Sequence, residues 1–269
     1  MGHKKRAVGL TAVVTGGSSG IGLWTARFLS DEGANVFDLS RHGNGEDGIS
    51  HISCDVSDEA SVDAAVKEIA GRTGRIDIVV NCAGFGISGA IEETETSDAR
   101  RLMDVDFFGT VIVNRACIGY LRKTKGKIVN ISSVAADVPI PFQAYYSASK
   151  AAISSYTLAL ANELRPFGIR VAAVKPGDTA TGFTAARIKN AEGDTLYGGR
   201  VSRSVAKMEK DERSGMSAEK AGRYVADVAL SRSGKPMYTI GFQYKAAELA
   251  LRLIPWRPAN RIIGSIYSK

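Results

Sequence analysis

The sequence predicts a single-domain α/β fold in which a doubly wound parallel sheet of about seven strands carries helices on both faces. Two observations lead to this prediction. Short, mostly apolar runs alternate with longer amphipathic stretches, which is the pattern of strands that crossover helices bury on both sides. A glycine-rich segment at residues 15–22 joins the first apolar run to the first amphipathic stretch, at the place of the first strand-to-helix turn in such a fold.

The elements follow from these runs. The predicted strands are the apolar runs at residues 10–14, 35–39, 49–54, 76–81, 127–132, 169–175 and 237–240. The predicted helices are the amphipathic stretches at residues 20–31, 59–72, 97–121, 146–164 and 218–230. Right-handed crossovers bring the carboxyl ends of all strands to one edge of the sheet, where ligands bind. Functional residues are therefore expected just after the strands.

Two segments interrupt the alternation within the predicted catalytic domain, residues 1–269. Residues 178–213 are rich in Gly, Thr, Ser and charge, and a long irregular stretch inside a compact domain is typical of a functional lid. Because this stretch follows the strand that ends at residue 175, we expect it to cover the substrate. Residues 242–269 form a basic, amphipathic C-terminal extension.

The composition and charge of the chain argue against several classes of protein. The formal net charge is +7, but the basic residues are dispersed and no recognition motif accompanies them, so we expect no nucleic-acid partner. No stretch approaches the roughly 20 apolar residues that span a bilayer, and no export signal is present, so we expect a cytoplasmic protein. The three cysteines are expected to be reduced and buried, and the three histidines lack ligand spacing, so no metal site is predicted.

The glycine-rich loop has the spacing Gly-x-x-x-Gly-x-Gly. Glycines between a strand and a helix let the backbone approach a pyrophosphate, and the helix N-terminus adds partial positive charge. The spacing differs from the general Gly-x-Gly-x-x-Gly fingerprint, and an ordinary turn also favours glycine. The position nevertheless indicates a Rossmann-type dinucleotide site, formed by Gly16, Ser18, Ser19, Gly20, Ile21 and Gly22.

A tyrosine and a lysine supply candidate acid–base chemistry. Tyr146 and Lys150 are four residues apart on a predicted helix, so their side chains share one face. A free tyrosine has a pKa of about 10, too high for efficient proton exchange near neutral pH. A neighbouring ammonium group lowers that pKa. Tyr145 lacks such a partner, because the residue four positions later is Ser149.

The glycine loop, the Tyr-x-x-x-Lys pair and a preceding serine together resemble the short-chain dehydrogenase/reductase family over about residues 8–240. The resemblance implies an enzyme that interconverts an alcohol and a carbonyl with a nicotinamide cofactor. Tyr146 would be the proton donor, and Lys150 would also hold the nicotinamide ribose. Ser133, rather than Ser132, has the family's spacing to the tyrosine and would orient the substrate oxygen. Relatives commonly form dimers or tetramers, so we expect a homodimer or homotetramer.

The cofactor choice depends on the end of the second strand. NAD-specific relatives usually carry an acidic residue where Ser40 stands, and here Arg41 follows it. Because a guanidinium suits a phosphate dianion, we expect NADP(H), with NAD(H) as the alternative. The basic residue that some NADP-dependent relatives place before the second loop glycine is absent, because Ser19 stands there.

The resemblance implies further cofactor contacts after the later strands. A helix cap or a plain turn is the competing interpretation of each. These residues are Asp55 and Val56 at the adenine, Asn81, Ala83 and Gly84 beside the ribose, and Pro176, Gly177, Thr179 and Thr181 at the carboxamide and pyrophosphate.

One position departs from the family pattern. Asp106 stands where the family usually has an asparagine whose backbone carbonyl supports a water beside the catalytic lysine. The backbone role survives this replacement. A buried carboxylate needs a partner or a raised pKa, and we expect Asp106 still to serve the proton relay.

The substrate is expected to be lipophilic. The pocket should draw on Phe85, Ile87, Val134, Val138 and Phe142, although core packing would also explain these apolar side chains. The segment at residues 85–89 and the basic tail resemble the branch that acts on hydroxysteroids, retinol and other lipid alcohols. A secondary alcohol or ketone such as a hydroxysteroid is therefore expected. A small sugar, an acyl-thioester ketone, or a non-catalytic dinucleotide-sensing role are the alternatives.

The basic tail at residues 242–269 has three interpretations. It can make weak peripheral contact with an anionic membrane, as basic amphipathic helices do. It can equally cap the substrate pocket or pack against a sister subunit.

Overall fold

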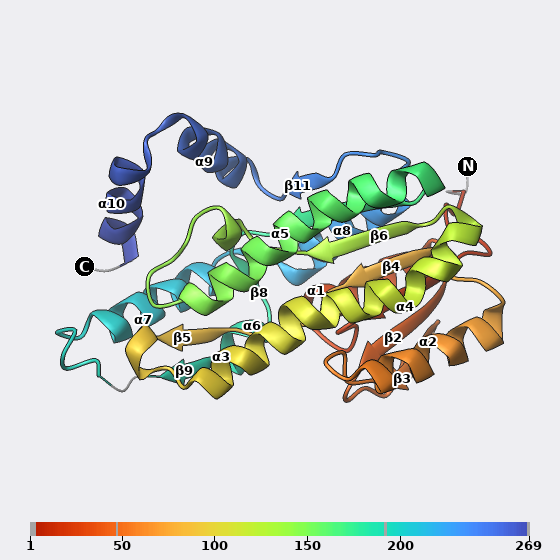
Figure 1. Ribbon diagram of the computed structural model, residues 1–269, viewed down its shortest axis with the longest axis horizontal. Helices are drawn as coiled ribbons and strands as arrows, with labels where there is room; N and C mark the ends of the chain where they lie inside the picture. The colour runs from red at the N-terminus through yellow and green to blue at the C-terminus, as the bar shows by residue number, and fades with distance from the viewer. Residues whose placement is uncertain (1–3, 47, 191–192, 268–269) are drawn as a thin grey trace.

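The protein is a three-layer α/β/α domain built on one seven-stranded sheet (Figure 1). The computed structural model describes residues 4–46, 48–190 and 193–267. Residues 191–192 of the expected lid and 268–269 of the extension lie outside the described residues. The strands run parallel in the order β11-β7-β6-β4-β1-β2-β3. This arrangement confirms the predicted doubly wound fold.

The strands of the main sheet follow the predicted apolar runs. They are β1 (Thr11–Thr15), β2 (Asn35–Ser40), β3 (Ile49–Ser53), β4 (Ile78–Asn81), β6 (Lys127–Ile131), β7 (Arg170–Lys175) and β11 (Met237–Thr239). Two short parallel pairs lie outside it, β5 (Ile87–Gly89) with β9 (Ile188–Asn190), and β8 (Thr179–Ala180) with β10 (Met216–Ser217). Every strand of the main sheet therefore ends at the same edge.

Helices bury both faces of the sheet, and each face has its own apolar cluster. One cluster includes Val62, Val113 and Leu160, and the other includes Leu29 and Val225. The first face carries α2 (Glu59–Thr73), α4 (Gly109–Thr124) and α5 (Ala144–Leu164), and the second carries α1 (Gly20–Asp31) and α8 (Ala218–Leu230). Burial on both faces explains why the strands are apolar throughout rather than alternating.

The helix predicted at residues 97–121 is confirmed, but it contains one wide turn that the sequence did not predict. The structure has α3 (Thr96–Met103), a π-helical turn η2 (Asp104–Phe108) and then α4. A Cβ on Gly109 would lie 2.8 Å from Cγ2 of Val56, so α4 begins only where a glycine allows this close contact. The wide turn places Asp106 inside the protein, where it is 0% exposed. Such turns are frequent at functional sites.

The segment at residues 178–213 is more regular than its composition suggests. Besides β8 and β9 it contains α6 (Phe183–Ala186) and α7 (Arg200–Arg213). Helix α7 buries Val201, Ser204 and Met208 on one face, so helical periodicity was present in a stretch that the abundant charge disguised. Its lid role stays a prediction. Elsewhere, the described residues contain three short 3-10 turns, η1 (Ile91–Glu93), η3 (Val134–Ala136) and η4 (Arg165–Phe167).

The C-terminal extension forms two helices, α9 (Phe242–Leu253) and α10 (Trp256–Tyr267). They lie beyond β11, at the upper left of Figure 1. Helix α10 packs on α7 and buries Ala259 and Ile263, whereas α9 buries none of its residues. Within the part of the chain that the structure describes, no helix is long and apolar enough to cross a membrane.

The close contact between α1 and α8 gives a test of the packing. A Cβ on Gly222 would lie 2.5 Å from Cβ of Trp24 and 2.8 Å from the backbone nitrogen of Thr25. Gly222→Ala must push the helices apart, and we expect it to lower the free energy of unfolding by about 1–3 kcal/mol. Urea unfolding measures the change.

The matched control for that variant is Gly119→Ala, also in a helix. A Cβ on Gly119 meets nothing within 4 Å, so this variant should gain roughly 0.5–1 kcal/mol from helix propensity. Equal effects at the two positions would contradict the packing described here.

Candidate active site

The glycine loop connects β1 to α1 with a backbone that requires glycine. Gly16 and Gly20 have φ of 64° and 54°, in the left-handed region that favours glycine. A Cβ on Gly22 would lie 2.2 Å from the carbonyl oxygen of Gly16, so α1 starts directly against the loop. Thr15 Oγ1 accepts hydrogen bonds from the backbone nitrogens of Cys82 and Ala83, both at 3.1 Å, and ties the loop to the end of β4.

The start of α1 fits a dinucleotide. Ser18 and Ser19 are exposed, and the Ser19 side chain makes no capping hydrogen bond. The first turn of α1 contains no acidic residue. The backbone N–H groups and the helix dipole therefore remain available for an anionic pyrophosphate. A cofactor would be held here by the loop backbone, with Ile21 and Gly22 packed behind it.

An acidic side chain near the cofactor edge escaped the sequence analysis. Asp38 accepts a hydrogen bond from Ser40 Oγ at 2.7 Å, and His51 Nδ1 lies 3.0 Å from the same carboxylate oxygen. The other oxygen is buried without a partner and faces Gly17, whose Cβ would lie 2.7 Å away. The two-residue alternation of a strand places residues 38 and 40 on one face, and this was the available signal. Arg41 is exposed just beyond them.

The predicted adenine residues follow the end of β3. Asp55 accepts hydrogen bonds from the Ser57 hydroxyl at 2.6 Å and from the Ser57 backbone nitrogen at 2.9 Å, and the Ser57 hydroxyl in particular lowers the pKa of Asp55. Asp58, not Asp55, caps α2 by accepting from the backbone nitrogen of Ala60 at 3.0 Å. Capping is therefore not the task of Asp55. Val56 is buried against Gly109.

The side chain of Asn81 belongs to a buried amide network. Its Nδ2 donates to Asn114 Oδ1 at 2.8 Å and to Asn130 Oδ1 at 2.9 Å. Asn130 in turn donates to the Thr157 hydroxyl at 2.9 Å. Sequence reasoning missed this network because its members come from β4, α4, β6 and α5. The side chain thus couples the sheet to its helices, and the following residues face the glycine loop.

The residues after Asn81 lie between the loop and the catalytic cluster. A Cβ on Gly16 would lie 3.0 Å from the backbone of Ala83, and one on Gly84 would lie 2.9 Å from Oδ1 of Asp106. Burial raises the pKa of Cys82 to about 12, so this thiol stays protonated. Among the described residues no group of three or more His, Cys, Asp or Glu could hold a metal ion.

The structure brings Ser133, Tyr146 and Lys150 together. One turn of α5 separates Tyr146 from Lys150, whose Nζ lies 5.4 Å from the centre of the phenol ring. Ser133 stands at the start of η3 and accepts a hydrogen bond from the backbone nitrogen of Ala135 at 3.1 Å. Its side chain is among the groups that lower the pKa of the tyrosine. Ser132 instead donates to the backbone oxygen of Lys150 at 2.8 Å, so it holds the helix rather than facing the pocket.

Asp106 forms a buried ion pair with Lys150. Its Oδ2 lies 3.0 Å from Lys150 Nζ, and its Oδ1 accepts from the backbone nitrogen of Phe85 at 2.9 Å. Ser149 donates to the same carboxylate at 3.4 Å. We expected the backbone of Asp106 to matter most. The structure shows that its side chain also contacts the lysine directly.

The ion pair changes the electrostatics expected for Tyr146. Burial raises the pKa of Tyr146, Lys150 lowers it, and Asp106 raises it again, so the net pKa lies above its ordinary value. The lowering by Lys150 is present, but a carboxylate shares the ammonium charge. Burial by itself lowers the pKa of Lys150. Asp106 and Tyr146 together raise that pKa by more than burial lowers it, so the pKa of Lys150 lies above its ordinary value. Near neutral pH the cluster therefore contains a protonated phenol beside a charged ammonium.

The segment that begins with Pro176 and Gly177 passes close to the glycine loop. Thr179 Oγ1 donates to the backbone oxygen of Gly177 at 2.9 Å. Thr181 Oγ1 accepts from the backbone nitrogen of Phe183 at 3.1 Å. The Cβ atom of Thr181 lies 3.5 Å from a Cβ built on Gly20. Pro176 contributes its backbone oxygen to Val134. Thr181 thus lies where the segment passes the glycine loop.

Two aromatic residues at the site were not anticipated. The Phe183 ring lies 5.4 Å from the Tyr146 ring, so α6 brings the 178–213 segment against the phenol of Tyr146. Tyr244 of α9 covers Gly177, and its hydroxyl donates to Asp178 Oδ2 at 2.6 Å. No sequence pattern linked either ring to the site, because both contacts depend on tertiary packing.

The expected pocket residues divide between core and surface. Ile87 is 2% exposed and belongs to the core, whereas Val134 and Val138 are half-buried. Phe142 adopts φ of 61° and packs edge-on against Tyr197. Phe85 stacks under the guanidinium of Arg101. The Phe183 ring supplies an apolar contact to Tyr146, whereas Ser133, Lys150 and Asp106 supply polar ones.

Known proteins with similar sequences and folds are dehydrogenases and reductases. The family model for short chain dehydrogenases matches residues 10–192. The chain is 39% identical over 231 residues to 3-ketodihydrosphingosine reductase of Bacteroides thetaiotaomicron, covering 84% of this chain and 86% of that protein. A short-chain dehydrogenase from Streptomyces avermitilis superposes with a TM-score of 0.80 at 26% identity, covering 94% and 97% of the two chains.

A second solved structure with a similar fold is a complex with a cofactor. It is the 3-ketoacyl-(acyl-carrier-protein) reductase from Brucella melitensis complexed with NADH, with a TM-score of 0.72, 25% identity, and coverage of 87% of this chain and 97% of that one. The fold and the comparisons define an oxidoreductase that binds NAD(P). The chain belongs to the short-chain dehydrogenase/reductase family.

The buried ion pair can be tested through stability. Lys150→Met leaves the Asp106 carboxylate buried without its cation, and we expect a loss of about 3–5 kcal/mol in the free energy of unfolding at pH 8. Burial raises the pKa of Asp106 in the folded protein, and removing Lys150 raises it further. The folded variant therefore binds a proton that the unfolded chain releases, so the loss shrinks as the pH falls and grows as it rises.

Urea unfolding at pH 5 and pH 8 measures the effect. The double variant Lys150→Met with Asp106→Asn should recover much of the loss at pH 8, because no unpaired charge remains. A single variant as stable as wild type at pH 8 would show that the two groups do not form a buried pair.

Proposed function

We propose that the chain is an NADP(H)-dependent oxidoreductase that interconverts a secondary alcohol and a ketone on a lipophilic substrate. The observation that carries the proposal is the cluster of Ser133, Tyr146 and Lys150 at the edge of the sheet that also carries the glycine loop. In this scheme the bound nicotinamide supplies the hydride for reduction.

In this proposal, side chains of the protein supply the proton and stabilise the charge that remains. Tyr146 donates its hydroxyl proton to the substrate carbonyl oxygen, and its raised pKa keeps the phenol protonated beforehand. Ser133 donates a hydrogen bond to the same oxygen and orients it. Lys150 stabilises the phenolate that remains, and Asp106 positions the lysine through their 3.0 Å contact.

The substrate proposal rests on the aromatic ring that packs against Tyr146. Phe183 lies against the phenol ring, and Phe142 packs nearby against Tyr197. A relative that acts on 3-ketodihydrosphingosine supports a long-chain ketone, and a hydroxysteroid is the other lipophilic candidate. The 3-ketoacyl carrier-protein reductase supports an acyl-thioester ketone as the alternative. A small sugar fits this apolar contact less well.

The cofactor proposal rests on Arg41. It is exposed beyond β2 without an ion-pair partner among the described residues, so it is available to a 2′-phosphate. Asp38 already accepts from Ser40 and faces His51, which limits its use as the ribose-binding acid of an NAD-specific site. Asp55, the Ala83–Gly84 backbone, Thr179 and Thr181 would complete the cofactor contacts.

The partner and location proposals follow the family pattern. We propose a cytoplasmic homodimer or homotetramer formed through α4 and α5. Leu158 on α5 and Phe108 just before α4 support this, because they are 43% and 50% exposed. We also propose weak peripheral membrane contact through residues 242–269. A dinucleotide-sensing regulator would bind NADPH without turnover.

The tyrosine assignment gives the main test. We expect Tyr146→Phe to lower kcat for ketone reduction at least about 1,000-fold, because no proton reaches the developing alkoxide. NADPH binding, followed by fluorescence titration, should stay within a factor of about three of wild type. Tyr145→Phe is the matched control and should keep full turnover. A Tyr146→Phe enzyme with wild-type kcat would refute the assignment.

The cofactor assignment gives a second test. Arg41→Ala should raise the KM for NADPH roughly 10-fold or more, because a charge-assisted contact to a phosphate contributes about 1.5–3 kcal/mol. The KM for NADH should change little. Steady-state rates with both cofactors measure the ratio. An unchanged KM for NADPH would remove the reason to prefer NADP(H).

A further inference from the structure

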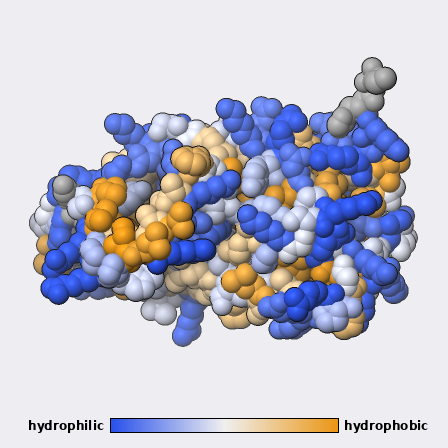
Figure 2. All heavy atoms as spheres, turned by 90° about the horizontal axis from the view of Figure 1, so that it is seen from above, coloured by the Kyte–Doolittle hydropathy of each residue, from blue (hydrophilic) through white to orange (hydrophobic). Residues whose placement is uncertain are grey.

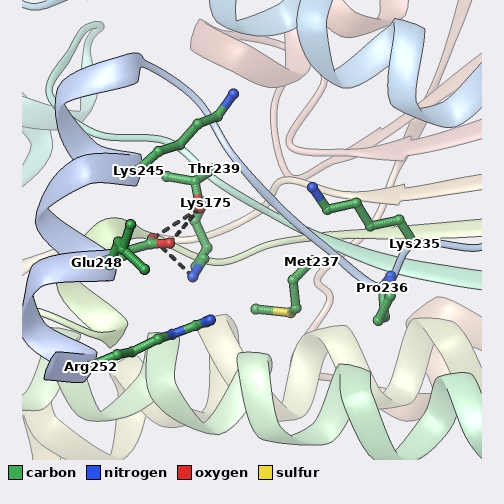
Figure 3. Close-up of a pocket in the computed structure, with 9 residues that line it drawn as sticks. Lys175, Lys235, Pro236, Met237, Thr239, Lys245, Glu248 and Arg252 are labelled. Carbon is green, nitrogen blue, oxygen red and sulfur yellow. Dashed lines mark hydrogen bonds and ion pairs between the residues drawn. The ribbon is translucent and has the colours of Figure 1, made fainter.

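A basic pocket lies beneath α9, outside the catalytic cluster. It is a cavity of about 340 Å³ between α9, β11 and the end of β7 (Figure 3). Its charged lining residues are Lys175, Lys235, Lys245, Arg252 and Glu248. In Figure 3, Lys245 and Arg252 both extend from α9 toward the side on which Lys235 lies. The pocket therefore gathers four cations around one acid.

The acid in this pocket is already neutralised. Glu248 lies 2.9 Å from Lys175 Nζ and also accepts from the Thr239 hydroxyl at 2.9 Å. Lys175 has a second partner in Asp137. Within the described residues, Lys235, Lys245 and Arg252 have no ion-pair partner. Three uncompensated cations around a cavity of this size suit a phosphate group.

The outer surface of α9 and α10 exposes several large apolar side chains among its basic ones. The exposed fractions are 87% for Phe242, 60% for Leu249, 78% for Leu253 and 69% for Trp256. Figure 2, seen from the side on which α9 and α10 lie, shows hydrophobic side chains gathered at this end with hydrophilic ones around them. Exposed apolar side chains grouped in this way mark an interaction site.

We propose that α9 and α10 dock on an anionic phospholipid bilayer, with a lipid phosphate in the basic pocket and the apolar side chains among the acyl chains. The inference deepens the membrane contact proposed above and does not use the catalytic residues. An anionic lipid supplies both a phosphate and apolar chains, which matches the two halves of the surface.

A second copy of the chain fits this surface poorly. In a two-fold interface the same patch meets itself. The patch contains the cations Lys245 and Arg252, together with the exposed Arg257 and Arg261 of α10. In such an interface two basic patches would face each other. The bilayer, in contrast, complements their charge. Docking through α9 would also place the membrane beside Gly177, which Tyr244 covers, and a lipophilic substrate would have a short path to the sheet edge.

Vesicle sedimentation with the full chain tests the proposal. Phosphatidylcholine vesicles are compared with vesicles that contain roughly 30% phosphatidylglycerol at about 0.1 M salt. We expect binding to the anionic vesicles only. Lys245→Ala with Arg252→Ala should lower the partition coefficient roughly 30-fold, since each cation contributes about 1 kcal/mol.

A matched control removes the same charge elsewhere. Lys67→Ala with Lys220→Ala replaces two exposed lysines on α2 and α8 and should leave the partition coefficient within about twofold of wild type. Leu253→Ser should weaken vesicle binding without changing the mass in solution measured by light scattering. Equal losses in the two double variants, or no preference for anionic vesicles, would overturn the proposal.

Two further outcomes decide between occupants. A lower solution mass for Leu253→Ser with unchanged vesicle binding would assign the surface to a second copy and overturn the proposal. Displacement from vesicles by inorganic phosphate at the same phosphate concentration would assign the pocket to free phosphate and also overturn it. Turnover of a water-soluble ketone without vesicles separates the two proposals. An active enzyme that ignores vesicles contradicts only the docking, and an inactive one that binds them contradicts only the proposed chemistry.

Discussion

The buried ion pair between Lys150 and Asp106 is the interaction on which the rest of the site depends. Neither side chain reaches solvent to a significant extent, so each charge needs the other. The pair exists because a π-helical turn directs Asp106 inward and because Gly84 leaves space for its carboxylate. It also keeps the ammonium charged beside Tyr146 while sharing that charge. The phenol is thereby protonated at rest, which suits donation to a carbonyl oxygen.

The parallel sheet brings the separate parts of the site together. All seven strands end at one edge, so the glycine loop, the end of β4 and the serine after β6 become neighbours although the chain separates them widely. Thr15 joins two of these loops directly. The Asn81–Asn130 contact couples adjacent strands to the helices behind them. Helix α5, which carries Tyr146 and Lys150, is therefore positioned by hydrogen bonds as well as by apolar burial.

The prediction succeeded where the signal was local and failed where it was not. The strands, the glycine loop and the Tyr-x-x-x-Lys spacing are short patterns, and each appears near its expected place. The π-helical turn between α3 and α4 places Asp106 inside the protein, which no pattern in residues 97–121 reveals. The contacts of Phe183 with Tyr146 and of Tyr244 with Gly177 likewise join segments that are distant along the chain.

The sequence by itself determined the fold class and the residue types at the candidate site, because apolar periodicity and residue spacing are properties of the chain alone. Tertiary structure decided the charge state of those residues. Whether Lys150 acts alone or in a pair, and whether Asp38 or Arg41 faces a cofactor, depends on burial and on neighbours from other elements. Electrostatic energies in a buried site depend on distances between such neighbours, and only the folded chain sets those distances.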